Sequence, residues 1–501
     1  MYTLCFVLVL LTCNGLNAQQ IIWAQLNNID KKTDFTKVIG QNKHGVYVLK
    51  HKNSTFRKYF IIERFDKRMN LMRSKIIKIP NAELQKIVVL ENDIVFFTKV
   101  FDKGYTSSLN VQHLDTNLNI DVPVVIAAEC DLPNANADFK IEYSENRKQF
   151  LAWYLTERNN TYEVNLCALD NFKTRTSKKI EIAKGAFDID FLKASVDVNG
   201  NFYCIYTESK SSKGNKASDF QTHLLCVNLQ DGTVKNVLIH NPEEFITYAD
   251  LAYNSSQNTM IASGFYGKTI DDEVVGYFSI QIALNGFEFI NNVQHPINRK
   301  TVAEVIGMKA EARGENLSKF KIRKTIPKTD GGQIIIAERS FITNQSDVFY
   351  VNGIAQTSYS KIFNNDEVLI LSIDSLGELL WDEILFKNQL STNDGGYNNG
   401  IVIMVNEDNF NIIYNDKLNA NADVIQVTFN EKGERTKKIL INSDQYYALV
   451  IPAEYNQVTA NSAVLPINQN RDYTYIKLLY WSDYSPIPLT KPFLVLFFSR
   501  S

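Results

Sequence analysis

The chain has 501 residues, of which 45% are hydrophobic and 22% are charged, values typical of a packed globular protein. Its net charge of -2, from 53 basic and 55 acidic residues, argues against a general nucleic-acid-binding protein, which would carry a basic excess. The length suits two or three ordinary domains, or one large all-β repeat domain.

The first residues, MYTLCFVLVLLTCNGLNAQQ, are typical of a secretory signal peptide, although a positive charge ahead of the apolar run is missing apart from the amino terminus. The apolar run, residues 4–11, is too short to span a bilayer as a permanent helix. We expect cleavage near Ala18 and an exported protein that is periplasmic, cell-surface or extracellular. Lipidation at Cys13 is the alternative, with Thr12 where such sites have Gly or Ala. No later segment has the length of a transmembrane helix.

A pattern of two hairpins recurs along the mature chain. A short turn precedes an alternating β-rich strand in NKHGVYVLKH, ENDIVFFTK, VNGNFYCIYTES and further segments, at first with a period of roughly 50–58 residues. A second hairpin follows each one, for example LILSIDSLGE with LLWDEILF. Each unit is therefore predicted to have four short antiparallel strands. Residues 301–312 are the exception and predict one helix inside an insertion.

Seven such units are clear, and an eighth arises if the two ends of the chain are joined. Residues 446–481 supply three strands, and IIWAQLNNI near the N-terminus supplies the fourth, because its Trp23 aligns with Trp381 of LLWDEILFK. This mixture of terminal strands would remove exposed sheet edges. The sequence thus predicts an all-β fold, a single β-propeller of eight four-stranded blades over residues 19–482, with residues 483–501 as a tail. Seven blades with an extra hairpin is the alternative.

The turn in SIDSLGELLW, residues 372–381, resembles the tryptophan-docking repeat of pyrroloquinoline-quinone dehydrogenases and of related outer-membrane assembly propellers. Gly377 and Trp381 keep the spacing of that repeat, whereas Asp374 lies one residue closer to the glycine. The whole chain resembles the exported propeller proteins of Bacteroidota. The enzymatic features of the quinone family are not carried over, because no adjacent cysteine pair is present. We expect a structural turn, in which Asp374 bonds the turn backbone and Trp381 packs between blades.

The cysteine pattern permits disulfides but no zinc site. Removal of the signal peptide leaves Cys130, Cys167, Cys204 and Cys226, without any CxxC or Cys/His cluster. Cys204 and Cys226 fall on neighbouring predicted strands and are the better candidate pair. Free buried thiols are the alternative. The sequence predicts neither a metal nor a cofactor.

Two sets of residues are candidates for binding. Strand ends place Glu157, Glu208 and Glu338 on one face of a propeller, where they could form a carboxylate ring or simply be solvated strand ends. Long insertions in residues 207–223, 296–320, 339–367 and 387–399 emerge on the same face, and loops on a rigid scaffold are where binding usually occurs. Their candidate contact residues are Phe341, Phe349, Tyr350, Tyr359, Asp394 and Tyr397.

These features favour a non-enzymatic propeller that binds a protein or glycan partner at the cell envelope through the loops on one face. The alternative is an enzyme that acts on a glycan in the central channel. A third hypothesis is a purely structural component of an envelope complex. No HExxH, GxSxG or Walker A motif occurs, so no catalytic residue is assigned.

Overall fold

The structure of the protein is a computed structural model. It describes residues 19–24, 35–51, 57–101, 107–128, 138–158, 161–183, 187–210, 220–239, 244–269, 272–352, 354–419, 421–445, 447–469 and 472–480. The predicted signal peptide with Cys13 and Ala18, the predicted tail and Cys130 lie outside the described residues.

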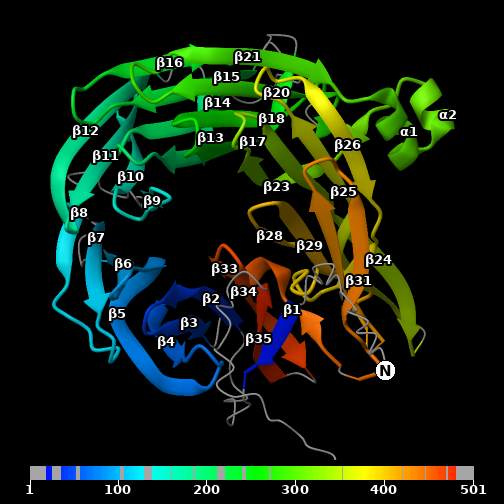
Figure 1. The fold of residues 1–501 in the computed structure, drawn as a ribbon, viewed down its shortest axis with the longest axis horizontal. Coiled ribbons are helices and arrows are strands. Elements are labelled where there is room, and N and C mark those ends of the chain that lie inside the picture. Colours follow the sequence, from blue (N-terminus) through cyan, green and yellow to red (C-terminus); the bar gives the residue numbers. More distant parts are fainter. Residues whose placement is uncertain are drawn as a thin grey trace, which may run out of the picture.

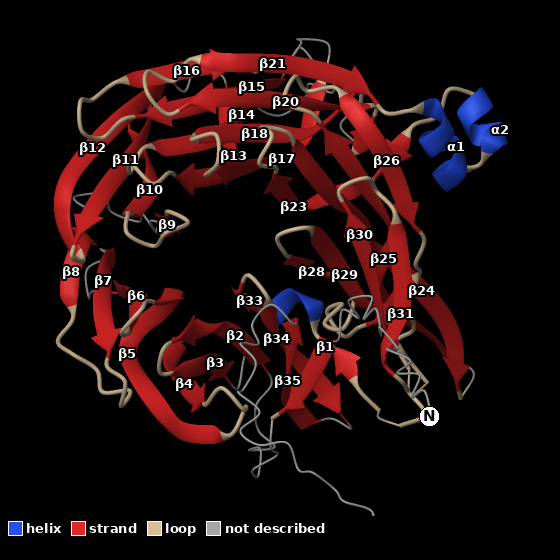
Figure 2. Ribbon diagram, in the orientation of Figure 1, coloured by secondary structure: helices blue, strands red, loops and turns tan. Residues whose placement is uncertain are grey.

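Antiparallel sheets follow one another around a ring, which is the architecture of a β-propeller (Figure 1). Strands make up nearly all of the regular structure (Figure 2). The predicted all-β propeller fold is therefore confirmed. No helix of the described residues is long and apolar enough to cross a membrane.

The first half of the chain forms three sheets. Seven strands pair in chain order: β2 (Phe35–Asn42), β3 (Gly45–His51), β4 (Arg57–Phe65), β5 (Leu71–Val89), β6 (Ile94–Phe101), β7 (Ser107–Leu114) and β8 (Val124–Ala128). The next four are β9 (Lys140–Tyr143), β10 (Phe150–Arg158), β11 (Thr161–Asp170) and β12 (Lys173–Ala183). The third sheet has β13 (Phe187–Val196), β14 (Phe202–Lys210), β15 (Phe220–Val227) and β16 (Val234–Leu238).

The second half continues the ring with three main sheets and one small one. One sheet has β17 (Phe245–Asn254), β18 (Thr259–Gly267), β20 (Gly276–Ala283) and β21 (Phe289–Pro296), and a two-stranded sheet pairs β19 (Glu273–Val274) with β22 (Leu317–Ser318). Another has β23 (Phe320–Pro327), β24 (Gln333–Val351), β25 (Ile354–Ile373) and β26 (Leu379–Leu385), with β27 (Gln389–Thr392) on β25. A four-stranded sheet has β28 (Val402–Val405), β29 (Asn409–Asn415), β30 (Val424–Asn430) and β31 (Arg435–Ile441).

The remaining sheet combines strands from both ends of the chain. It contains β32 (Leu449–Val450), β33 (Asn456–Thr459), β34 (Ser462–Gln469), β35 (Asp472–Tyr480) and β1 (Gln19–Trp23), with a short 3-10 turn, η2, at Pro452–Glu454. β1 pairs antiparallel with β35, from Gln19 opposite Tyr480 to Trp23 opposite Ile476. The N-terminal strand therefore pairs with the last described strand of the chain.

The apolar core lies between neighbouring sheets rather than inside one central mass. Trp153 of β10 packs on Phe202 of β14 with ring centroids 5.7 Å apart, for example. Because each sheet is packed between two others, β3 and β18 are buried along their whole length, on both faces. The half-buried alternation expected from the sequence is seen instead in the outer strand β16.

Two local features depart from the regular repeat. The single helix expected over residues 301–312 is two helices, α1 (Arg299–Ile306) and α2 (Met308–Ala312), because Gly307 adopts a φ of +88° between them. Pro80 lies inside β5, whose pairing passes from β4 to β6 near this residue. A proline at this changeover interrupts neither ladder.

The SIDSLGELLW turn is structural, as predicted. Asp374 Oδ1 accepts hydrogen bonds from the backbone N–H groups of Leu376 and Glu378, both at 2.9 Å, and Gly377 has a φ of +93°. Trp381 packs against the core between two neighbouring sheets and donates its Nε1–H to the carbonyl of Glu431 at 2.9 Å.

Candidate functional site

A cavity of about 460 Å³ lies where three sheets meet, at the base of the β24–β25 hairpin. β23 and β24 supply its charged side chains, Lys321, Arg323 and Glu338. Phe341 and Phe363 of the hairpin supply aromatic surface, and residues from the β27–β28 connection, β28 and η2 form the facing wall. The cavity therefore combines a charged wall with a largely apolar one.

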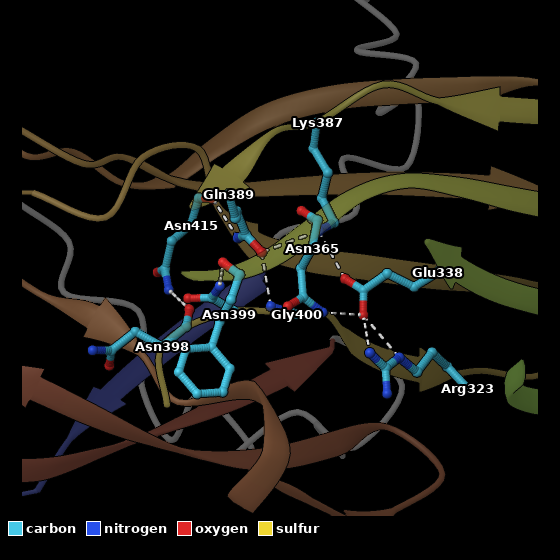
Figure 3. Close-up of polar contacts among 10 residues, drawn as sticks. Arg323, Glu338, Asn365, Lys387, Gln389, Asn398, Asn399, Gly400 and Asn415 are labelled. Carbon is cyan, nitrogen blue, oxygen red and sulfur yellow. Dashed lines mark hydrogen bonds and ion pairs between the residues drawn. The ribbon is translucent and has the colours of Figure 1, made fainter. Parts of the chain in front are cut away.

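The carboxylate of Glu338 is held by two cations and an amide, and its side chain has no exposed surface. Lys387 Nζ lies 2.7 Å from Oε1. Arg323 Nε donates to Oε2 at 2.8 Å, its Nη2 lies 2.5 Å from the same oxygen, and Asn365 Nδ2 donates to it at 2.9 Å. Figure 3 shows how these groups converge on the carboxylate.

The charges around Glu338 decide its protonation. Burial alone would raise the pKa of Glu338, but the charges of Lys387 and Arg323 and the hydrogen bonds lower it, so the carboxylate is ionised. Burial lowers the pKa of the Lys387 ammonium, partly offset by Glu338. Among the residues that line the cavity, Lys321 and Arg323 outnumber Glu338, so this wall carries a surplus positive charge.

A β-bulge brings Arg323 to this position. In the pairing of β23 with β24, Ile322 faces Ala337 and Lys324 faces Ile336, so Arg323 is the extra residue. Bulges commonly redirect a side chain beside a functional site. The same bulge recurs in the first strand of five other repeats, where the extra residues are Ile39, Gln85, Leu192, Thr247 and Val458. Among these six positions, only Arg323 carries a charge.

A second layer of hydrogen bonds holds Lys387 in place. Its Nζ also donates to the carbonyl of Asn365 at 2.7 Å and to Oε1 of Gln389 at 3.0 Å. Gln389 in turn accepts from the backbone N–H of Gly400 at 2.7 Å and donates to the carbonyl of Asn415 at 2.7 Å. The chain of contacts thus links β25 to β29 and fixes the cation from behind (Figure 3).

One amide on the facing wall is incompletely bonded. Asn399 lines the cavity, is 5% exposed, and donates its Nδ2 to the carbonyl of Phe363 at 3.1 Å. Its Oδ1 is buried without a hydrogen-bond partner in the described part of the chain, as is Oδ1 of the preceding Asn398. Unpaired buried acceptors are unfavourable, so Asn399 marks a polar edge of the cavity that is incompletely satisfied.

The three glutamates of the predicted carboxylate ring lie on three different sheets. Glu157, Glu208 and Glu338 lie on β10, β14 and β24, which are spread around the ring (Figure 1). Burial raises the pKa of Glu208, whose Oε1 lies 3.9 Å from His223 Nε2, whereas Glu338 is ion-paired. Within the described ranges, no group of three or more His, Cys, Asp or Glu side chains could hold a metal ion.

The long insertion of residues 339–367 is a β-ribbon rather than a loop. β24 and β25 continue past their own sheet as a two-stranded antiparallel extension, in register from Ser340 opposite Asn365 to Val351 opposite Ile354. Residues with high β-propensity, such as those at 341–343 and 348–351, favour strands here. Tyr350 and Tyr359 are 73% and 80% exposed.

The other predicted contact residues lie in different surroundings. Phe349 on the ribbon is exposed, whereas Phe341 at its base lies under the Nζ of Lys319, 4.6 Å from the ring centroid. Asp394 accepts hydrogen bonds from Ser391 Oγ and the N–H of Gly396, so it stabilises its own turn.

Tyr397 turns away from the ribbon and toward the sheet that contains both chain ends. Its ring lies 6.1 Å from that of Tyr473, and its hydroxyl accepts from the N–H of Thr36 at 3.4 Å. Burial raises its pKa. Tyr397 therefore packs between sheets and contributes little free surface.

The predicted disulfide between Cys204 and Cys226 is wrong. Both are free, buried thiols, as is Cys167. In the β14–β15 register, Cys204 faces Leu225 and Cys226 faces Tyr203, so the two cysteines point to opposite faces of the sheet. They accordingly belong to the cores on its two sides.

Sequence reasoning missed the two cations of this site. Arg323 and Lys387 lie in an ordinary strand pattern and a long connection, and neither belongs to a motif. The repeat offers one usable signal. When the repeats are aligned at the bulge, Arg323 stands where the others have Ile, Gln, Leu, Thr or Val.

No protein-family model and no curated protein sequence matches the chain. Solved structures with a similar fold include the WD40 domain of SCAP from fission yeast, at 9% identity and a TM-score of 0.38, covering 92% of this chain and 98% of that one. A eukaryotic initiation factor has 9% identity and a TM-score of 0.42, covering 91% and 87%.

Prolyl oligopeptidase B from Galerina marginata is also similar, at 10% identity and a TM-score of 0.40. The match covers 87% of this chain and 55% of that one. Likenesses this distant do not support a functional assignment.

Proposed function

We propose that this protein is an exported propeller that binds a protein partner through the β24–β25 ribbon. The observation that carries the proposal is the ribbon itself, a two-stranded extension whose apolar side chains are exposed. Rigid scaffolds that project such elements are a common basis of recognition.

Four of the six exposed large apolar side chains of the ribbon lie on one face. Side chains of a strand alternate between faces, and the register places Ile342, Val348, Tyr350 and Tyr359 on the same one. They are 58%, 61%, 73% and 80% exposed, respectively. We call this set the tyrosine face. Tyrosine is enriched in the cores of protein interfaces and among the residues that carry most of their binding energy.

The edges of the ribbon are also open to pairing. Beyond Arg339 on β24, and between Ile354 and Lys361 on β25, no further strand of the described chain pairs with it. Only Asp347 and Lys361 are charged among residues 340–364. Soluble proteins usually protect such edges with charge. A bare edge beside an apolar face therefore suits a partner that presents an extended segment.

The architecture we propose is an eight-bladed ring closed by β1 and β35. Its support is the sheet count, with the long strand β5 serving two successive blades, and the pairing of β1 with β35. Such closure would give the ribbon a rigid base. Export follows from the N-terminal sequence of residues 1–18, and the partner would lie at the cell envelope or outside the cell.

The alternative, a glycan-active enzyme, has one observation in its favour. Glu142 lies on β9, and burial raises the pKa of its carboxyl despite the charges of Lys86 and Lys193. A glycosidase needs a second carboxylate placed for the task. Asp250, another acid on a first strand, is paired instead with Lys193 at 2.8 Å. We therefore place this alternative second.

The proposal is tested by removing the ribbon while keeping the cavity. Thr343 and Ile362 face each other in register, so residues 344–361 can be replaced by an Asn-Gly turn. The intact and shortened proteins are used to capture partners from envelope extract. A partner captured specifically by the intact protein and lost with the shortened one supports the proposal. Identical captures by both proteins contradict it.

A further inference from the structure

We propose that the cavity at the base of the ribbon binds a small organic carboxylate. The charged group of this ligand would lie at Lys321 and Arg323, and its body against the apolar wall. The proposal concerns a different site from the tyrosine face and does not depend on a protein partner.

The residues that line the cavity carry an uncompensated positive charge. Glu338 is completely buried and both its oxygens are occupied, so it cannot neutralise an additional cation. Lys321 forms no ion pair within the described residues. The cavity thus presents one uncompensated lysine beside an arginine that is only partly used. An anion is the complementary ligand.

The guanidinium of Arg323 is already held in one orientation before a ligand binds. Its Nε and Nη2 are fixed on Glu338, so the guanidinium plane is held without a ligand. Its Nη1 has no acceptor among the described residues, and 34% of the side chain is exposed. A fixed guanidinium with an outward N–H is well suited to a planar carboxylate, because little side-chain entropy is lost on binding.

The size of the cavity and its apolar wall determine what kind of ligand fits. A volume of about 460 Å³ matches a small molecule rather than a folded partner. Phe363, Ile401 and Pro452 line the cavity with apolar surface. Tyr455 adds its ring, since its hydroxyl is already bonded to the backbone of Ile403. A ligand that has an apolar ring as well as a carboxylate would satisfy both walls.

The test is calorimetric titration of the full chain with cyclohexanecarboxylate and with its uncharged methyl ester. We expect saturable binding of the acid, at least tenfold tighter than that of the ester. Lys321→Gln should weaken acid binding about five- to tenfold and leave the Glu338 ion pairs intact. Ser340→Phe, which fills the cavity without changing a charge, should abolish it. The matched control is Lys432→Gln in an exposed turn, which should bind as the wild type does.

Three results would overturn the proposal. The acid and the ester could bind equally, Ser340→Phe could leave binding unchanged, or only an acidic peptide such as Gly-Glu-Gly could bind while the small acid does not. The variant that lacks residues 344–361 should still bind the acid, because it retains every lining residue. This separates a failure of the cavity proposal from a failure of the ribbon proposal. Circular dichroism of each variant confirms that it is folded.

Discussion

Lys387 Nζ lies 2.7 Å from Glu338 Oε1, and neither side chain is exposed by more than 1%. Burying an ion pair adds little net stability, but removing one partner is destabilising because the remaining buried charge loses part of its compensation. The pair also connects β24 to the chain segment that follows β26, so it stabilises the base of the ribbon.

Removing one partner should therefore be costly. We expect Lys387→Met to lower the free energy of unfolding by about 3–5 kcal/mol, measured by urea denaturation. The matched control is Lys140→Met. Lys140 Nζ lies 2.6 Å from Asp138 Oδ2, but these side chains are 51% and 73% exposed. Its loss should cost at most about 1 kcal/mol. Equal effects of the two variants would contradict the assigned burial.

Acid should selectively weaken the contribution of Glu338 to the free energy of unfolding. Because the folded-state pKa of Glu338 is lowered, its stabilisation is complete above the unfolded value of about 4.3 and is lost as the pH falls through the folded pKa. The stability gap between wild type and Glu338→Gln should be largest near neutral pH and shrink below about pH 4. Urea midpoints for both proteins between pH 7 and pH 3 measure it. A gap that grows with acid would refute the ionised carboxylate.

Two turn glycines should respond differently to alanine. Gly433 has a φ of +82°, and a Cβ there would lie 2.9 Å from Cδ2 of Trp381. Gly286 has a φ of +72°, but nothing lies within 4 Å of its Cβ position. Gly286→Ala should cost about 1–2 kcal/mol from the backbone alone. Gly433→Ala should cost about 1–3 kcal/mol more, because the tryptophan must shift. Thermal unfolding of the pair checks this, and equal losses would mean that Trp381 does not pack as described.

The cysteines should be free but unreactive in the folded protein. Burial raises the pKa of Cys226 to about 12 and that of Cys204 well above its usual value, so almost no thiolate is present at neutral pH. We expect Cys167, Cys204 and Cys226 to resist iodoacetamide until the protein is unfolded. In denaturant without reductant, mass spectrometry should find all three labelled. Protection of Cys204 and Cys226 that requires a reductant to remove would instead indicate a disulfide.

The sequence predicts the repeat because most sheets of the propeller are formed by strands that follow one another closely in the chain. Each hairpin carries its own turn chemistry, such as Asp374 with Gly377, and Trp23 with Trp381 indicated which strands are equivalent. The pairing of β1 with β35 agrees with that reasoning.

The candidate site could not be predicted in the same way. Glu338 was identified from its strand end, but its partners Arg323 and Lys387 reach it through a bulge and a long connection. The pairing of Cys204 with Cys226 failed because strand proximity says nothing about which face each residue occupies. That depends on a register in which a shift of one residue reverses every side chain.

The sequence predicts a loop for residues 339–367, because insertions in a repeat are usually irregular. In the register of β24 with β25, Tyr350 and Tyr359 fall on the same face. The sequence indicates these aromatic residues as candidates for binding, but only the register shows that they share a face.

The most direct test of the central claim compares the two faces of the ribbon. One variant carries Tyr350→Ser and Tyr359→Ser on the tyrosine face, and the matched control carries Phe349→Ser and Ile354→Ser on the opposite face. Each removes two exposed apolar side chains. Partner capture is quantified by mass spectrometry against the wild type. The account predicts at least a tenfold loss of the captured partner for the tyrosine-face variant only. Equal capture by both variants, or an equal loss, would contradict it.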